Sequence, residues 1–276
     1  MPSLASSSNR VIEPALFAAR FWRDFFGSML THTVRAAMTK LLVLAAGILL
    51  VPHARAATNS HLDLVVALDL TKSVAVKGPD GTTEFQKNVD GVTRLLVEVP
   101  AGARVSIIGI TDHSFTQPYF LLSATVPDDP GYFGERLGAA RNEIVRVWKL
   151  RSARLQPSFA ATDILGVLML ASQIFNQQRS SGAQRTLVIF SDMRNHTREL
   201  DLESSSVASP LRKSNKTLAA VDLHQVQVYA LGVDGAGQGT ANWRALELFW
   251  RGYLQASGAS LYTFSVLREL PASARP

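Results

Sequence analysis

Three short polar segments of the sequence could together hold a metal ion. The first is Asp69-Leu70-Thr71-Lys72-Ser73, which has the pattern D-x-[ST]-x-S. The second is Thr162-Asp163, and the third is Ser191-Asp192. Each segment adjoins an apolar stretch, so all three are expected to meet at one edge of a sheet. Carboxylate and hydroxyl oxygens in near-octahedral array are the ligands that a hard divalent cation such as Mg²⁺ prefers.

The elements that must position these segments follow from the hydrophobic pattern. Short apolar runs predict strands, and apolar residues at helical spacing predict helices. The predicted strands are Leu62–Leu70, Arg104–Ile110, Tyr119–Ala124 (the hairpin partner of the second), Thr186–Phe190, Gln225–Leu231 and Leu261–Phe264. The predicted helices are Thr83–Val97, Tyr132–Leu150, Thr162–Phe175 and Asn242–Ala256. This alternation predicts an α/β fold: a doubly wound, mainly parallel central sheet with one antiparallel strand and helices on both faces.

The N-terminal segment has the features of an export signal. Lys40 precedes the apolar run Leu41–Val51, and Ala54-Arg55-Ala56 follows it. We therefore expect residues 1–56 to be a leader with a signal peptide that is cleaved before Ala57. The run is shorter than the ~20 apolar residues of a spanning helix, although an uncleaved anchor or a buried helix is the alternative.

The position of the apolar run also bears on where translation starts. Signal peptides begin close to their apolar core, which makes Met38 a candidate for the true start. An extended targeting segment around Leu16–Met29 is the other explanation. Residues 57–276 have the length of one domain, and we expect no membrane span within them.

Charge and cysteine content narrow the class of partner. The whole chain has 28 basic and 22 acidic residues. Six of the basic and two of the acidic residues lie in 1–56, which leaves 22 and 20, a net charge of only +2. A nucleic-acid partner is therefore not expected. The absence of cysteine excludes disulfides and thiolate metal sites, and it is compatible with a location in the periplasm or, alternatively, outside the cell.

The three polar segments resemble the metal-ion-dependent adhesion site of the von Willebrand factor A family, over about residues 60–265. That site combines D-x-S-x-S with a distant threonine and a later aspartate, and Thr71 stands here where serine is commoner. The resemblance implies a Rossmann-like fold, hydroxyls in contact with the metal and aspartates that often act through water. It implies these site residues: Asp69, Thr71, Ser73, Thr162 and Asp192. The cation would be Mg²⁺, or Mn²⁺ or Ca²⁺ in its place, and an Asp or Glu of a protein ligand would complete its coordination.

Other polar residues near these segments are candidates for the rim of the site: Asp112, His113, Arg194 and His196. Arg194–Thr217 is long and polar and begins just after Asp192, so we expect it to select the ligand. Each motif residue also has a structural alternative, since Ser73 or Thr162 could cap a helix and Asp192 could close a turn. The loop Gly232–Gly239 contains neither of two glycine patterns that bind nucleotides, G-x-x-x-x-G-K-[ST] and G-x-G-x-x-G.

Two other functions compete with metal-dependent ligand binding. An enzyme is disfavoured because Thr71 replaces the second aspartate of the D-x-D-x-[TV] pattern of haloacid dehalogenase-type phosphatases, and because no G-x-S-x-G occurs. A metal-dependent hydrolase is thus the weaker alternative. The stronger one is a structural subunit of an envelope assembly that docks without a metal.

Overall fold

The computed structural model describes residues 61–178, 182–203, 218–233 and 239–274. The predicted leader, most of the predicted ligand-selecting loop (204–217) and most of the glycine-rich loop (234–238) lie outside these ranges.

Six strands form one sheet in the order β3-β2-β1-β4-β5-β6. The strands are β1 (Leu62–Asp69), β2 (Arg104–Ile110), β3 (Tyr119–Thr125), β4 (Gln184–Phe190), β5 (Val226–Leu231) and β6 (Ser260–Ser265). Every neighbouring pair is parallel except β2 and β3, which form the predicted antiparallel hairpin. All eight residues of β1 are buried, as expected of a continuous apolar strand covered on both faces.

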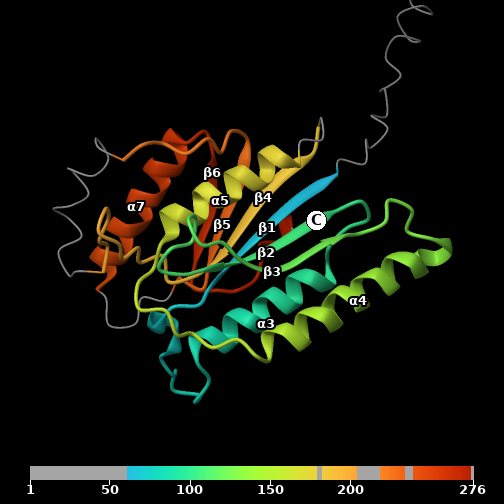
Figure 1. Cartoon of the computed structure of the whole chain (residues 1–276), viewed down its shortest axis with the longest axis horizontal. Coiled ribbons are helices and arrows are strands. Elements are labelled where there is room, and N and C mark those ends of the chain that lie inside the picture. The colour runs from blue at the N-terminus through green and yellow to red at the C-terminus, as the bar shows by residue number, and fades with distance from the viewer. Residues whose placement is uncertain (1–60, 179–181, 204–217, 234–238, 275–276) are drawn as a thin grey trace, which may run out of the picture. The chain divides into compact units, whose positions relative to one another are not determined.

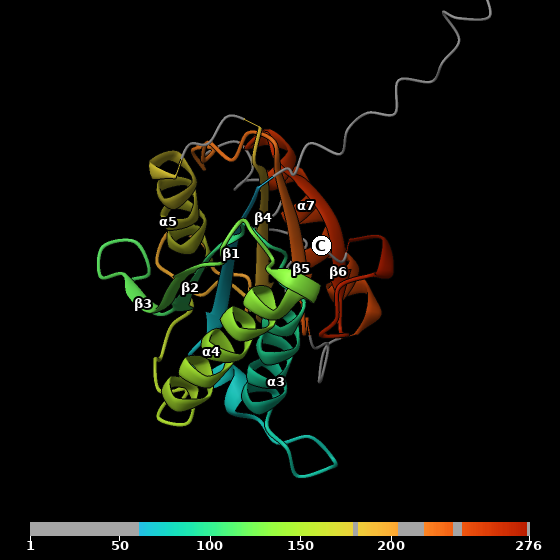
Figure 2. The same cartoon turned by 90° about the vertical axis from the view of Figure 1, so that its right-hand side faces the viewer.

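Helices cover both faces of the sheet (Figures 1 and 2). One face carries α3 (Glu84–Val97) and α4 (Glu135–Ser152), and the other carries α5 (Ile164–Gln177) and α7 (Thr240–Ala256). Two apolar clusters follow from this arrangement: Val65 of β1 packs with α5 and α7, whereas Val66 packs with α3 and α4. The predicted fold class is therefore confirmed. In the part of the chain that the structure describes, no helix is both long and apolar enough to cross a membrane.

Short 3-10 helices complete the described chain: η1 (Lys72–Ala75), η2 (Tyr132–Gly134) and η3 (Ala272–Ala274). Element boundaries differ from the predicted ones mainly at α4. The prediction started this helix at Tyr132, but it starts at Glu135 because Gly131, Phe133 and Gly134 have φ values of 81°, 55° and 79°. Left-handed backbone of this kind cannot continue into an α-helix.

The sheet reverses its winding direction at β1. The chain moves from β1 outward to β2 and β3, and then returns to place β4 on the other side of β1. Leu68 of β1 is in register with Phe190 of β4, so the residues that follow them emerge side by side. Ligands of open α/β sheets bind at such a switch point, outside the carboxyl ends of the strands.

Candidate metal site

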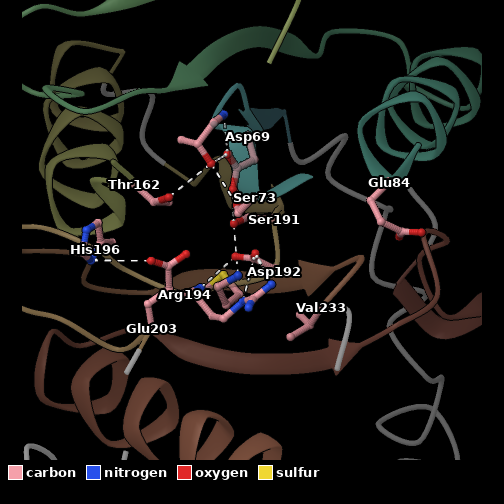
Figure 3. Close-up of polar contacts among 12 residues, drawn as sticks. Asp69, Ser73, Glu84, Thr162, Ser191, Asp192, Arg194, His196, Glu203 and Val233 are labelled. Carbon is pink, nitrogen blue, oxygen red and sulfur yellow. Dashed lines mark hydrogen bonds and ion pairs between the residues drawn. The ribbon is translucent and has the colours of Figure 1, made fainter. Parts of the chain in front are cut away.

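Asp69, the last residue of β1, is the central carboxylate of the candidate site. Its side chain is fully buried. Oδ1 accepts hydrogen bonds from the backbone N–H of Thr71 at 2.9 Å and from the Thr71 hydroxyl at 2.7 Å. Oδ2 accepts a hydrogen bond from the hydroxyl of Ser191 at 2.6 Å (Figure 3). A buried carboxylate is thus held at the switch point by donors from both neighbouring strand ends.

Three hydroxyl oxygens gather beside this carboxylate. The Thr71 hydroxyl lies 2.9 Å from that of Ser73, and the Thr162 hydroxyl lies 3.1 Å from that of Thr71. Adjacent ligands of an octahedron with bonds of ~2.1 Å lie about 3 Å apart. The spacing of the hydroxyls therefore fits neighbouring ligand positions around a cation of the size of Mg²⁺.

All three hydroxyl protons are engaged in hydrogen bonds within the site. A threonine hydroxyl has one proton and two lone pairs, and the proton of Thr71 goes to Asp69. Ser73 and Thr162 must then both donate to Thr71. At least one of these two protons would have to turn away before the Thr71 oxygen could bind a cation.

Asp192, the second carboxylate, is nearly as buried as Asp69. Its Oδ1 accepts from the backbone N–H of Arg194 at 3.0 Å. Its Oδ2 accepts from Nε of Arg194 at 3.0 Å and from Nη2 at 2.8 Å (Figure 3). The predicted turn at Asp192 is therefore present, and the same carboxylate also holds a guanidinium.

The electrostatics of the site favour a further positive charge. The pKa of Asp69 is raised from 3.8 to about 7, chiefly by burial and also by the negative charge of Asp192. Hydrogen bonds from Ser191 and Thr71 act in the opposite direction. A cation between the two carboxylates would offset both the lost hydration and the mutual repulsion.

Thr162 is placed by its backbone rather than by a capping role. Its N–H donates to the carbonyl of His196 at 3.2 Å, and the N–H of His196 donates back at 2.8 Å. The N-cap of α5 is Asp163, whose Oδ1 accepts from the N–H of Gly166 at 2.7 Å. Ser73 likewise bonds to Thr71 and supplies no cap to η1. The capping alternatives for Thr162 and Ser73 are thus wrong, and both hydroxyls face the candidate site.

The rim candidates divide into two groups. Arg194 contacts Asp192 directly. The ring of His196 instead lies 3.3 Å from Asp201 and 3.6 Å from Glu203, although its backbone pairs with Thr162. Asp112 and His113 lie in the turn after β2, and the imidazole of His113 is exposed.

Two residues outside the predicted ligand set, Ser191 and Asn195, help to build the site. Ser191 bonds to Asp69 and also accepts from the N–H of Met193 at 3.0 Å. Asn195 is fully buried, and its Oδ1 accepts from the first two N–H groups of α5, those of Ile164 and Leu165, at 2.9 and 3.2 Å. The position of Ser191 directly after a buried strand was visible in the sequence, but its bond to Asp69 was not. Asn195 has no such signal, because its partners lie about 30 residues away.

The donor set is unusual in being poor in charged ligands. Within the described ranges, no three His, Asp or Glu side chains come together as a metal cluster. A cation at this site would therefore depend on the hydroxyls of Thr71, Ser73 and Thr162 together with the two aspartates.

Comparisons with known proteins give structural similarity only. No protein-family model and no curated protein sequence matches the chain. Among solved structures, BatB from Bacteroides thetaiotaomicron is 18% identical, with a TM-score of 0.37, over 62% of this chain and 65% of that one. An aerotolerance-related membrane protein from Bacteroides fragilis is 19% identical, with a TM-score of 0.34, over 62% and 66%. A von Willebrand factor type A protein from Catenulispora acidiphila is 12% identical, with a TM-score of 0.39, over 75% and 39%. The chain thus spans less than two thirds of the length of each of these three structures, and we take the chemistry of the site from its own geometry.

Proposed function

We propose that this chain is an exported von Willebrand factor A-type domain that binds a protein ligand through a divalent cation. The cation is held by Asp69, Thr71, Ser73, Thr162 and Asp192. The observation that carries the proposal is the chain of hydroxyls, spaced at 2.9 and 3.1 Å, that adjoins a buried carboxylate at the switch point of the sheet.

The spacing of the hydroxyls also bears on which cation binds. Ca²⁺ has bonds of 2.3–2.6 Å, which would separate adjacent octahedral ligands by about 3.3–3.7 Å. Mg²⁺, and Mn²⁺ with similar hard-ligand chemistry, require less spreading of Thr71, Ser73 and Thr162. We therefore expect Mg²⁺ or Mn²⁺ to bind more tightly than Ca²⁺.

The neutral ligands define what the cation does when bound. With the hydroxyls in direct contact and the aspartates acting through water, much of its positive charge is uncompensated, so a carboxylate from another protein completes the coordination favourably. The ligand is accordingly a protein with an exposed Asp or Glu. Binding is favoured over hydrolysis because the ring of His196 contacts Asp201 and Glu203, which leaves it badly placed to activate a hydroxyl or water at the site.

Export places the ligand in or beyond the cell envelope. The basis is the apolar run Leu41–Val51 with its basic flank and the Ala54-Arg55-Ala56 site that follows. The periplasm is the favoured compartment, and an envelope complex is the favoured setting. A subunit of such a complex that docks without metal is the competing function.

Calorimetric titration of the purified protein with Mn²⁺ tests the metal site. Thr162→Val removes one hydroxyl ligand and should weaken binding at least about tenfold, the equivalent of ~1.4 kcal/mol. Thr186→Val is the matched control, since Thr186 is buried on β4 and its hydroxyl bonds to no described residue. Equal affinity in the two variants would contradict the site. Absence of binding by the wild type would favour the metal-independent subunit.

A further inference from the structure

Arg194 and Asp192 form an ion pair that differs from those on the surface of the domain. Only 22% of the Arg194 side chain and 4% of the Asp192 side chain are exposed. The guanidinium donates to the same carboxylate oxygen from Nε and from Nη2. The electrostatic interaction of a mostly buried ion pair is stronger than that of an exposed pair, because water and salt screen it less.

The backbone conformation between Asp192 and Arg194 positions the guanidinium next to the Asp192 carboxylate. Met193, between the two residues, is fully buried and has a φ of 62°, which is rare for a residue other than glycine. The indole N–H of Trp250 donates to the carbonyl of Met193 at 2.9 Å, and Ser191 holds its N–H. Such a conformation costs about 1–3 kcal/mol and persists where surrounding contacts impose it, often at functional sites.

The residue after Arg194 is fixed as well. The amide of Asn195 is buried and bonds to the start of α5 through Oδ1 and to the carbonyl of Leu200, at 2.7 Å, through Nδ2. Arg194 is thus held between two anchored neighbours, and only its side chain is free to move. The contact with Asp192 follows from a fixed backbone rather than from a chance position of a surface side chain.

In this geometry the positively charged guanidinium of Arg194 contacts Asp192, the same carboxylate that would help to hold the proposed cation. We propose that Arg194 is an internal competitor of the cation: its guanidinium neutralises Asp192 in the metal-free protein and is displaced from it when the metal binds. The inference rests on the proposed metal site. Its physical basis is electrostatic. A divalent cation beside Asp192 would repel the guanidinium, and it would offset the negative charge of the carboxylate that attracts the guanidinium.

The competition sets the affinity of the site for metal. While Arg194 remains on Asp192, binding must first break a charge-assisted pair, so the cation binds more weakly than to the same ligands without the arginine. A variant without the Arg194 guanidinium should therefore have a less stable metal-free state. Its equilibrium should shift toward the metal-bound state.

Titration with Mn²⁺ alone, on the purified protein, tests this competition. Arg194→Gln should bind Mn²⁺ about tenfold more tightly than the wild type, equivalent to ~1.4 kcal/mol. Arg194→Lys, which keeps the charge, should remain closer to the wild type. Arg251→Gln is the matched control, because Arg251 of α7 also pairs with a carboxylate, that of Glu247 at 2.8 Å, away from the site, and its affinity should be unchanged.

A measurement on the wild type keeps the test independent of variant stability. The Nε–H resonance of Arg194, identified by its absence in Arg194→Lys, should shift when Mg²⁺ saturates the protein, since the bond to Asp192 is lost. An unchanged resonance on saturation would overturn the competition. Equal or weaker Mn²⁺ affinity of Arg194→Gln would also overturn it, while leaving the metal site in place. No Mn²⁺ binding by the wild type or any variant would overturn the metal site itself, and the competition with it.

Discussion

The hydroxyl of Ser191 donates a 2.6 Å hydrogen bond to Oδ2 of Asp69, and both side chains are fully buried. This bond joins the carboxyl ends of β4 and β1, the two strands between which the winding of the sheet reverses. The polar site and the apolar sheet are therefore coupled, because the same contact positions Asp69 and closes the strand ends.

Removal of this hydroxyl should weaken the fold itself. Ser191→Ala leaves a buried carboxylate oxygen and the N–H of Met193 without their partner, and each unpaired buried group costs roughly 1–3 kcal/mol. We expect the free energy of unfolding, measured by urea denaturation in chelator, to fall by about 2–6 kcal/mol. Thr186→Val should change it little, since that hydroxyl makes no hydrogen bond to the described residues. Comparable stability of the two variants would count against the role of Ser191.

The raised pKa of Asp69 predicts a pH dependence of the metal-free protein. Between its unfolded pKa of 3.8 and its folded pKa of about 7, the folded state binds more protons than the unfolded state. The contribution of Asp69 to stability therefore falls as the pH rises through this window. Asp69→Asn removes the titration, so from pH 5 to pH 8 its stability should improve relative to the wild type by up to about 3 kcal/mol.

Urea unfolding in chelator at several pH values measures this difference. The same series with saturating Mg²⁺ is the control, because the cation should remove the loss at pH 8 in the wild type. Parallel pH profiles of wild type and Asp69→Asn in chelator would show that Asp69 is not the group responsible.

Replacing glycine by alanine within a helix usually stabilises a protein, but Gly166 near the N-terminus of α5 should be an exception. Alanine is a better helix former than glycine by about 1 kcal/mol, and Gly138→Ala in α4, where a Cβ meets nothing within 4 Å, should stabilise the protein by up to that amount. Gly166→Ala should instead destabilise it. A Cβ there would lie 2.0 Å from the Asp163 carboxylate, which caps α5 and accepts from Ser114. Thermal unfolding of both variants decides, and equal shifts in Tm would contradict the steric argument.

Export predicts the start of the mature chain. The polypeptide recovered from an envelope fraction should begin at Ala57, because the apolar run is followed by Ala54-Arg55-Ala56. N-terminal sequencing measures this directly. A product that retains Leu41–Val51 would point to an uncleaved anchor.

The strands, and the edge of the sheet at which the polar segments meet, could be predicted because both follow from local patterns. Apolar runs such as Leu62–Asp69 can be buried on both faces only in a covered sheet, and parallel strands bring their carboxyl ends to one edge. Asp69, the last residue of β1, and Asp192, the second residue after β4, were therefore expected at the same edge of the sheet, and the charge of Asp192 does act on Asp69.

The parts that could not be predicted depend on contacts between distant segments. The left-handed φ of Met193, which turns Arg194 back onto Asp192, is imposed by Ser191 and by Trp250, 57 residues away. No periodicity in the sequence indicates a strained residue of this kind. The identity of Asp163 as the N-cap in place of Thr162 was equally hidden, since both residue types cap helices.

Diffraction from crystals soaked in Mn²⁺, with data collected at the Mn absorption edge, tests the metal site most directly. We predict one anomalous peak beside Asp69, at about 2.1–2.2 Å from the hydroxyl oxygens of Thr71, Ser73 and Thr162. The guanidinium of Arg194 should have left Asp192 in the same crystal. The absence of a peak at saturating Mn²⁺, with Arg194 still on Asp192, would contradict metal binding at this site.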